Sequence, residues 1–372
     1  MSQIRAAFVM EQTLGHVTHH RNLEAAAARH GAIQPTWIGV PYDLTGLDRY
    51  VPPYRNWSVR ASLRARCALG RAAAASRFDA LFFHTQVTAL FAVDLMRRTP
   101  TVLSLDATPI NYDLVGRAYG HRPDRGTWLD HRRFEMNRAA FRAARALVTW
   151  SAWAKASLVH DYGIESSRIS VVPPGAADAY FGIGATRNAA VGDRPVRLLF
   201  VGGDFVRKGG PLLLDSAREA RTRRRFEIHV VTKDPVESRP GVIVHRGIGP
   251  NSPELLRLFA AADAFVLPTH GDCLPLVLME ASAAGLPLIA TRVGALSEVA
   301  AEGRSAIMMS PGDGHALRAA IVSMVDDEDL RLRFGRAARQ LALERFSAAT
   351  NCRRVLDLVV EVTASVASRD VA

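Results

Sequence analysis

The stretch that decides the fold is Phe265–Val299, which reads FVLPTHGDCLPLVLMEASAAGLPLIATRVGALSEV. An apolar run ends at Pro268, a polar loop follows, and an apolar helical pattern begins near Pro275 or Leu276. Proline is favoured at the start of a helix, because its missing N–H would have no intrahelical acceptor there. The sequence therefore predicts a strand, a loop and a helix in succession, with a further strand over PLIAT.

The same alternation of short apolar runs and amphipathic helical patterns extends over the whole chain. Toward the N-terminus we expect strands at IRAAFVM, PTWIGV, DALFFH, TVLSL, ALVTW and ISVVPP. Only the stretch Gly182–Val196, GIGATRNAAVGDRPV, breaks the pattern, so it is the best candidate for a linker. Such alternation is typical of parallel sheets covered by helices on both faces. We therefore expect an α/β protein with two Rossmann-like domains facing a cleft that holds a ligand.

Length and charge narrow the class of protein. A chain of 372 residues should hold two domains. The 47 basic and 36 acidic residues leave +11, which suits nucleic acid or an anionic membrane as a partner. However, only three basic residues are lysine, so 47 − 3 = 44 are arginine, which indicates a composition bias plus a small anion site. Most aromatic residues fall in apolar strands and helices, so we expect no nucleic-acid partner.

The cysteines and the apolar runs of the sequence indicate the cellular location of the protein. Cys67, Cys273 and Cys352 are odd in number and far apart, which argues against a disulfide framework and structural zinc and fits a reducing cytoplasm. The run AAFVM is too short for a signal peptide, and the longest apolar stretch contains Glu280. We therefore expect a soluble cytoplasmic protein. Peripheral contact with the inner face of a membrane, through the Arg-rich run 221–226, stays an open alternative.

Two carboxylates stand out in the deciding stretch. Asp272 precedes the expected helix and Glu280 lies eight residues further on, so they are roughly 12 Å apart along a helix axis. That separation is too long for a glycosidase pair but matches two ends of one extended polar ligand. Glu280 lies in an apolar run, where an ionised carboxylate is costly without partners. A Glu on a solvated helix stripe is the alternative.

These residues carry a family resemblance. Asp272 and Glu280, followed by AxAxGLPLIATxVGAxxEV, resemble the Glu-x7-Glu motif of retaining GT-B glycosyltransferases, especially glycosyltransferase family 4. The resemblance implies that Glu280 binds the ribose of a nucleotide and that Asp272 lies against the donor sugar. This chain has Asp where Glu is usual, and Cys273-Leu274-Pro275 where Gly-Phe-Gly is common. These three residues and Leu276 are expected to border the donor at the helix N-terminus, whose free N–H groups suit phosphate.

A second motif is LLFVGGDFVRKGGPLLLDSA, in which a strand leads through a glycine turn and basic residues into a helix. Backbone amides in such a turn can cradle an anion, and we assign Gly203 of this turn to the donor site. The GxGxxG spacing of dinucleotide-binding proteins is missing. The segment resembles the family pattern in which an arginine and a lysine neutralise the donor pyrophosphate, and Lys208 matches the lysine. The family arginine falls near Gly203 and is absent, so Arg207 is the candidate replacement. A solvated charged turn is the alternative.

The N-terminal half offers a glycine and histidines. Gly15 permits a close approach of backbone to ligand, and its segment resembles the glycine loop of GT-B proteins, so Gly15 is assigned to the donor site. His16 is predicted to contact the acceptor. The spacing of His16, His19 and His20 is interpreted as a polar helix start rather than a metal site, since a metal would also need a carboxylate and a fourth ligand.

Two further residues end strands of this half. His84 closes the strand DALFFH, at the edge where such sheets place ligands, and aligns with a family histidine that contacts the donor sugar. A structural role for a lone strand-end histidine is the alternative. Asp106 stands where many relatives have histidine, and we assign it to the acceptor site. Its alternative is a turn aspartate before Pro109.

The leading hypothesis is a retaining glycosyltransferase, moving a sugar from a nucleotide-sugar donor to an acceptor hydroxyl. It would serve polysaccharide, glycolipid or natural-product glycoside synthesis, without metal or cofactor. Residues 1–185 would bind the acceptor, 195–345 the donor, and 346–372 would cross back to the first domain. The predicted catalytic residues are Lys208, Asp272 and His84.

The Asp-x-Asp within DDED, residues 326–329, is interpreted as a helix cap. A sugar-nucleotide epimerase or phosphorylase, a non-catalytic nucleotide-sugar-binding relative and a nucleic-acid-binding protein are the alternatives, and the oligomeric state stays open.

Overall fold

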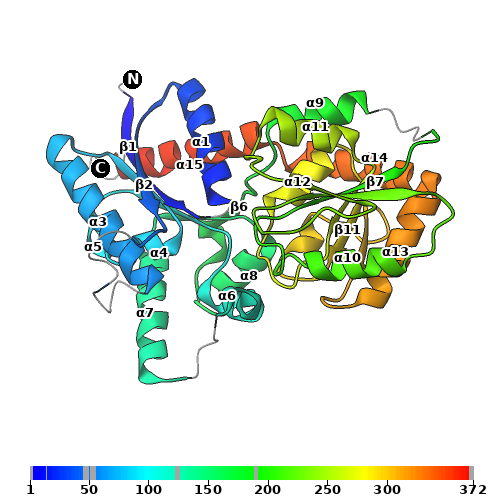
Figure 1. The fold of residues 1–372 in the computed structure, drawn as a ribbon. Coiled ribbons are helices and arrows are strands. Elements are labelled where there is room, and N and C mark those ends of the chain that lie inside the picture. The colour runs from blue at the N-terminus through cyan, green and yellow to red at the C-terminus, as the bar shows by residue number, and fades with distance from the viewer. Residues whose placement is uncertain are drawn as a thin grey trace. The chain divides into compact units, whose positions relative to one another are not determined.

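The computed structural model describes residues 3–13, 15–44, 50, 56–121, 126–187 and 192–367. The chain forms two compact units (Figure 1). Unit 1 comprises Met1–Asn111, Asp124–Pro173 and Ala349–Ala372, and unit 2 comprises Tyr112–Pro123 and Pro174–Ala348. The C-terminal residues thus join the first unit, as the family resemblance implies. Both segments of unit 2 begin inside the range 1–185 that the sequence analysis gives to the first domain, at Tyr112 and at Pro174.

Unit 1 is built on a parallel sheet of six strands in the order β2-β1-β3-β4-β5-β6. The strands are β1 (Ile4–Gln12), β2 (Ile33–Pro41), β3 (Ala80–His84), β4 (Thr101–Leu105), β5 (Ala146–Thr149) and β6 (Ile169–Val171). The helices are α1 (His16–His30), α3 (Trp57–Ala75), α4 (Gln86–Ala89), α5 (Val93–Arg98), α7 (Trp128–Ala143), α8 (Ala152–His160) and α15 (Ala348–Ala367), with a short 3₁₀ turn η3 (Ser166–Arg168). Helix α6 (Pro109–Val115) begins in unit 1 and ends in unit 2, and the 3₁₀ turn η2 (Gly116–Tyr119) belongs to unit 2.

Strand β1 shows why this sheet needs helices on both faces. Its side chains alternate between two hydrophobic clusters: Ala7 and Val9 face the cluster formed with α3, α7 and α8. Phe8 and Met10 face the cluster formed with α1 and α15. Successive strand residues point to opposite faces, so a run without polar residues is buried on both. The predicted apolar strand IRAAFVM is thereby confirmed.

Unit 2 contains a second parallel six-stranded sheet, in the order β12-β11-β10-β7-β8-β9. The strands are β7 (Val196–Val201), β8 (Phe226–Val231), β9 (Val242–His245), β10 (Ala264–Leu267), β11 (Leu288–Thr291) and β12 (Ala306–Met309). The helices are α9 (Asp178–Thr186), α10 (Gly210–Glu219), α11 (Pro253–Ala261), α12 (Leu276–Ala283), α13 (Gly314–Asp326) and α14 (Glu328–Arg345), with a 3₁₀ turn η4 (Leu296–Glu298). The two Rossmann-like halves predicted from the sequence are confirmed.

One prediction is partly wrong. The expected linker begins at Gly182, but helix α9 continues through Thr186. Residues 188–191 of that stretch lie outside the described residues. The glycines of GIGAT do not prevent a helix here, because α9 is held by tertiary packing: a Cβ on Gly184 would lie only 2.3 Å from the carbonyl oxygen of Ala283 in α12.

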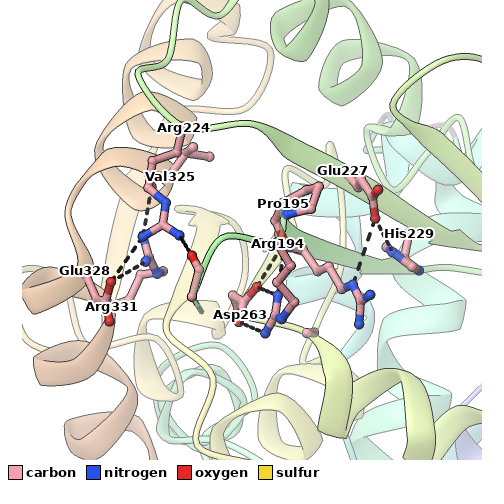
Figure 2. A network of polar contacts seen from close by, with 12 residues as sticks. Arg194, Pro195, Arg224, Glu227, His229, Asp263, Val325, Glu328 and Arg331 are labelled. Carbon is pink, nitrogen blue, oxygen red and sulfur yellow. Dashed lines mark hydrogen bonds and ion pairs between the residues drawn. The ribbon is translucent and has the colours of Figure 1, made fainter. Parts of the chain in front are cut away.

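A network of charged side chains fixes the start of the unit 2 sheet (Figure 2). Arg194 donates to both carboxylate oxygens of Asp263, at 2.7 and 2.9 Å. The same carboxylate accepts the backbone N–H of Arg197, in β7, at 2.7 Å. At the far side of the network, buried Arg331 donates to the carbonyl of Val325 at 2.9 Å. Asp263 directly precedes β10, so it joins the beginnings of two neighbouring strands.

The acidic run at residues 326–329 has a structural role. Asp327 accepts the N–H of Leu330 at 2.8 Å and caps α14, as predicted. Asp326 accepts the N–H groups of Arg223 and Arg224, at 2.8 and 3.1 Å, and thereby holds the Arg-rich run 221–226. Over the described residues, no helix combines the length and the hydropathy needed to cross a membrane.

Candidate functional site

Unit 2 brings the two predicted donor motifs together. Strands β7 and β10 are parallel neighbours, so their carboxyl ends lie at the same edge of the sheet. The loop after β7 carries Arg207 and Lys208, and the loop after β10 carries Asp272. Residues more than sixty positions apart in the sequence therefore meet at the edge where open α/β sheets bind ligands.

Asp272 is the centre of this arrangement. Lys208 Nζ lies 2.7 Å from Oδ2, and Arg207 Nη1 lies 3.3 Å from Oδ1. The hydroxyls of Thr269 and Tyr119 donate to the same carboxylate, at 3.0 and 3.4 Å. Burial opposes ionisation of Asp272, but the charges of Lys208 and Arg207 outweigh it and hold its pKa below the usual value. Asp272 is therefore a fixed anion at neutral pH.

Arg207 and Lys208 differ in how fully they are engaged. The Arg207 side chain is 5% exposed. It donates to the carbonyl of Gly271 at 2.7 Å and to Asp204 at 3.0 Å, and its guanidinium carbon lies 4.2 Å from the ring centre of Tyr119. The ammonium of Lys208 has three donors, and the described residues offer it one polar partner, Asp272. Lys208 is thus the cation with donors to spare, whereas Arg207 holds the loops together.

Glycines permit the close approach of the two loops. A Cβ on Gly209, where φ is +79°, would lie 2.0 Å from the carbonyl oxygen of Pro268, so the β7 loop packs directly on the end of β10. By contrast, a Cβ on Gly203 would meet open space. A side chain would therefore fit at position 203, so packing does not explain the glycine there. The assignment of Gly203 to the donor site stays a prediction.

The turn Val293-Gly294-Ala295 contacts the backbone of the loop that carries Asp272. A Cβ on Gly294, where φ is +51°, would lie 2.3 Å from the backbone oxygen of Asp272. The N–H of Ala295 donates to the carbonyl of Cys273 at 2.9 Å. The loop that carries Asp272 is therefore fixed by backbone contacts as well as by its side chain.

Helix α12 begins at Leu276, with Pro275 as its N-cap, as the sequence predicts. Pro275 offers no side-chain cap, and although the N–H of Leu278 donates to the carbonyl of Pro275, the N–H groups of Leu276 and Val277 stay available to an anion. Cys273, Leu274 and Leu276 are buried and fix the approach of the loop to the helix.

Glu280 is the unusual member of α12. It is 7% exposed, and among the described residues its carboxylate has no hydrogen-bond or ion-pair partner. Burial raises its pKa to about 7. The buried hydroxyl of Tyr180 also has no partner in the described structure, and burial together with Glu280 raises its pKa. A buried carboxylate in this state favours a ligand that supplies hydroxyl donors.

Unit 1 gathers a second cluster at the carboxyl ends of β1, β3 and β4. Glu11 accepts hydrogen bonds from Thr85 at 2.5 Å and from Thr13 at 2.8 Å. His16, the first residue of α1, lies between two carboxylates: Nδ1 is 3.6 Å from Glu11 and Nε2 is 3.6 Å from Asp106. Burial opposes protonation of His16, but Glu11 and Asp106 raise its pKa to about 10. His16 is thus a cation held between two anions.

Three buried rings complete this cluster. The imidazole of His84 stacks on Trp150, with ring centres 5.2 Å apart, and His19 packs against both rings. Burial and the charge of His16 lower the pKa of His84 and of His19, the latter to about 3. Neither imidazole nitrogen of either residue has a hydrogen-bond partner in the described structure. Gly15 caps α1 with φ of −66°, an ordinary conformation, so its backbone requires no glycine.

The structure brings together residues that the sequence analysis singled out one by one. Lys208, Arg207 and Asp272 meet in unit 2. His16 contacts both Asp106 and the ring of His84 in unit 1. Among the described residues, no group of three or more His, Cys, Asp or Glu side chains is arranged to hold a metal ion.

The sequence analysis missed several participants, of which Glu11 and Tyr119 are the most informative. Glu11 closes the apolar strand IRAAFVM, and a carboxylate at the end of a buried strand is the signal that would have found it. Tyr119 has no such signal, because it lies in the separate segment Tyr112–Pro123 that packs with unit 2.

Comparison with known families covers both halves of the chain. Residues 195–327 match the model of Glycosyl transferases group 1, and residues 15–179 match that of Glycosyltransferase Family 4. An MMP alpha-(1->4)-mannosyltransferase from Mycolicibacterium hassiacum is 30% identical over 223 residues, covering 57% of this chain and 53% of that protein. A D-inositol 3-phosphate glycosyltransferase from Pseudarthrobacter chlorophenolicus is 32% identical, covering 53% of this chain and 51% of that protein. The chain spans about half the length of the curated relatives it matches.

Solved structures share the fold over nearly the whole chain. Sucrose-phosphate synthase from Thermosynechococcus elongatus superposes with a TM-score of 0.76 at 16% identity, covering 98% of this chain and 100% of that one. Anabaena HepE in complex with UDP and glucose gives 0.69 at 13% identity, covering 96% and 100%. Both sheets and these structures agree on the GT-B fold, and the two parts of the chain match the models of Glycosyl transferases group 1 and of Glycosyltransferase Family 4.

Proposed function

We propose that this chain is a retaining glycosyltransferase that moves a sugar from a nucleotide-sugar donor to an acceptor hydroxyl. One observation carries the proposal: the edge of unit 2 joins the cation Lys208, the free N-terminus of α12 and the unpartnered carboxylate of Glu280. A nucleotide sugar has the matching groups in one molecule, because its diphosphate is anionic and its ribose carries hydroxyl donors.

In the proposed reaction, fixed positive groups of the protein stabilise the negative charge of the leaving diphosphate. The bond between the sugar C1 and the diphosphate oxygen breaks, and the nucleoside diphosphate leaves with the electron pair. Lys208 and the N–H groups of α12 stabilise that growing negative charge, so no metal ion is required. Glu280 anchors the ribose. Asp272, held as an anion, orients the sugar hydroxyls, and the departing phosphate takes the proton of the acceptor hydroxyl on the same face.

The unit 1 cluster is the proposed acceptor side. Asp106 is partly exposed and has one ion-pair partner in the described structure, His16. Its second carboxylate oxygen can therefore accept a hydrogen bond from a hydroxyl of the acceptor. His84 is completely buried and its lowered pKa keeps the imidazole neutral, so its assignment to the donor sugar stays a prediction. Sugar acceptors suit such a site. The cytoplasmic location and the peripheral membrane contact stay predictions.

Names of relatives support the reaction class without fixing the substrates. The related proteins are named as a mannosyltransferase and a D-inositol 3-phosphate glycosyltransferase, and HepE was solved with UDP and with UDP-glucose. Release of free nucleoside diphosphate together with a glycosylated product would separate transfer from epimerisation.

The test starts from donor binding. UDP-, GDP- and ADP-sugars are screened by thermal shift, since a donor at 100 times its dissociation constant adds about 2.7 kcal/mol of stability. Turnover and the anomer of the product are then followed by NMR for the wild type, Lys208→Ala and Glu280→Gln. Arg336→Ala is the control, because Arg336 is an exposed cation of α14 and lies outside the loops that follow β7 and β10. Wild-type turnover in both site variants, or an inverted anomer, would overturn the proposal.

A further inference from the structure

Unit 1 contains a basic cavity at the edge of its sheet opposite to the His16 cluster. The cavity measures about 1000 Å³ and is lined by three connections that lead from a helix into a strand. They are residues 97–100 before β4, 142–146 before β5, and 165–170 around η3 and the start of β6. Because β4, β5 and β6 are adjacent and parallel, their first residues meet at one edge, whereas the His16 cluster lies at strand ends.

Each connection contributes arginine, and we call the result the arginine cavity. Its arginines are Arg97, Arg98, Arg138, Arg142, Arg145 and Arg168. Two glutamates, Glu135 and Glu165, also line it, so six positive and two negative charges leave a net charge of +4.

The arginines divide into engaged and free side chains. Arg138 pairs with Glu135 at 3.1 Å, and Arg168 donates to backbone carbonyls at the end of α7. The other four side chains are exposed, and no hydrogen bond or ion pair of theirs occurs within the described ranges: Arg97, Arg98, Arg142 and Arg145.

Helix polarity explains only part of this pattern. Arg97 and Arg98 lie in the last turn of α5, and Arg142 lies in the last turn of α7, where positive side chains offset the helix dipole. Arg145 lies beyond α7, and the carbonyls at that end are already bound by Arg168. Four unpaired cations around one cavity repel one another, and an anion between them would remove that repulsion.

We propose that the arginine cavity binds a phosphate-bearing anion, either a free phosphate compound or the headgroup of a phospholipid. The guanidinium fork matches the oxygens of phosphate in a bidentate manner, which favours phosphate over a simple halide. The volume exceeds what a single inorganic phosphate fills, so a diphosphate or a larger phosphate ester fits better. This site is separate from the donor loops of unit 2, and the inference does not depend on the proposed function.

The experiment compares two double variants with equal loss of charge. Arg142→Gln/Arg145→Gln alters the cavity, and Arg333→Gln/Arg336→Gln alters two exposed arginines of α14 in unit 2. Both are made in a Lys208→Gln background, which removes the cation that the proposed function assigns to the donor diphosphate. Pyrophosphate is titrated by calorimetry, and sedimentation with phosphatidylcholine vesicles is measured with and without phosphatidylglycerol. Thermal melts check folding, and Arg97→Gln/Arg98→Gln replaces the first variant if it does not fold.

We expect the cavity variant to lose at least about tenfold in affinity, since two charge-assisted hydrogen-bonding groups are removed, while the α14 variant stays close to its parent. Binding of pyrophosphate alone would identify a free phosphate compound, and binding of phosphatidylglycerol vesicles alone would identify a headgroup. Absence of both, or an equal loss in both double variants, would overturn the proposal, because the second result reports net charge rather than a site.

Discussion

Replacing Tyr119 by leucine removes one side of the enclosure around Arg207 and Asp272. The tyrosine ring lies 4.2 Å from the Arg207 guanidinium carbon, and its hydroxyl donates to Asp272 at 3.4 Å. The segment that carries it also packs directly on Gly271: a Cβ at that position would lie 2.6 Å from the Cβ of Ala118. Leucine retains apolar volume but provides neither the aromatic face nor the hydroxyl.

The two contacts give the expected magnitude. A largely desolvated cation–π contact is worth about 2 kcal/mol, and a long hydrogen bond contributes about 0.5 kcal/mol. We therefore expect Tyr119→Leu to lower the free energy of unfolding by about 2.5 kcal/mol. Tyr119→Phe, which keeps the ring and loses only the hydroxyl, should lose about 0.5 kcal/mol. Arg207 and Asp272 would then be less fixed, so the KM for the donor should rise roughly tenfold in the leucine variant.

The assay combines denaturant unfolding with donor titration in the wild type, both Tyr119 variants and Gly271→Ala. The alanine tests the same packing from the opposite side, because its Cβ would have to displace the segment. Leu114→Ala, at an exposed position of the same segment, is the control. Equal stability and equal donor KM in the leucine and phenylalanine variants would refute the reasoning, since the ring would then contribute nothing.

Other measurements follow from the same geometry. The pKa of Glu280 is raised from 4.5 to about 7. Its contribution to stability is therefore full below about pH 4.5 and is lost as the pH rises through about 7. We expect Glu280→Gln to flatten that part of the pH profile of the free energy of unfolding. The pKa of His16 is raised to about 10, so its contribution to the free energy of unfolding is full below about pH 6.5 and is lost toward pH 10. In Glu11→Gln we expect an NMR titration to show the pKa of His16 lowered by at least about one unit. Gly294→Ala should destabilise the protein by more than about 1 kcal/mol, and by more than Gly303→Ala, which has a similar positive φ but open space around it; equal melting curves would contradict this.

The sequence predicts the sheet elements well, because their apolar runs are continuous. The run around Phe265 and the motif before Lys208 both indicate buried strands, and ligand loops follow such strands in open sheets. The start of α12 is also predictable, since Pro275 suits the position before a helix. What the sequence does not contain is the lateral order that makes β7 and β10 neighbours.

Side-chain partnerships are harder to predict than strands. Arg207 is predicted to face the phosphate, yet the structure shows it buried against Asp272 and Tyr119. Its neighbour Lys208 has the less enclosed charge, a difference that depends on which way each side chain leaves the turn. His16 appears in the sequence as a helix-start residue, and its charge follows only from the two carboxylates that the fold places on either side of it.

The short acid at position 272 has an evolutionary consequence. Its carboxylate already meets four donors, one of them from Tyr119, at the distance that an aspartate reaches. A glutamate there would push its head group past these donors and crowd the aromatic ring. Positions 119 and 272 should therefore change as a pair in descendants of this chain, and the longer acid should be tolerated only where the ring has been replaced by something smaller.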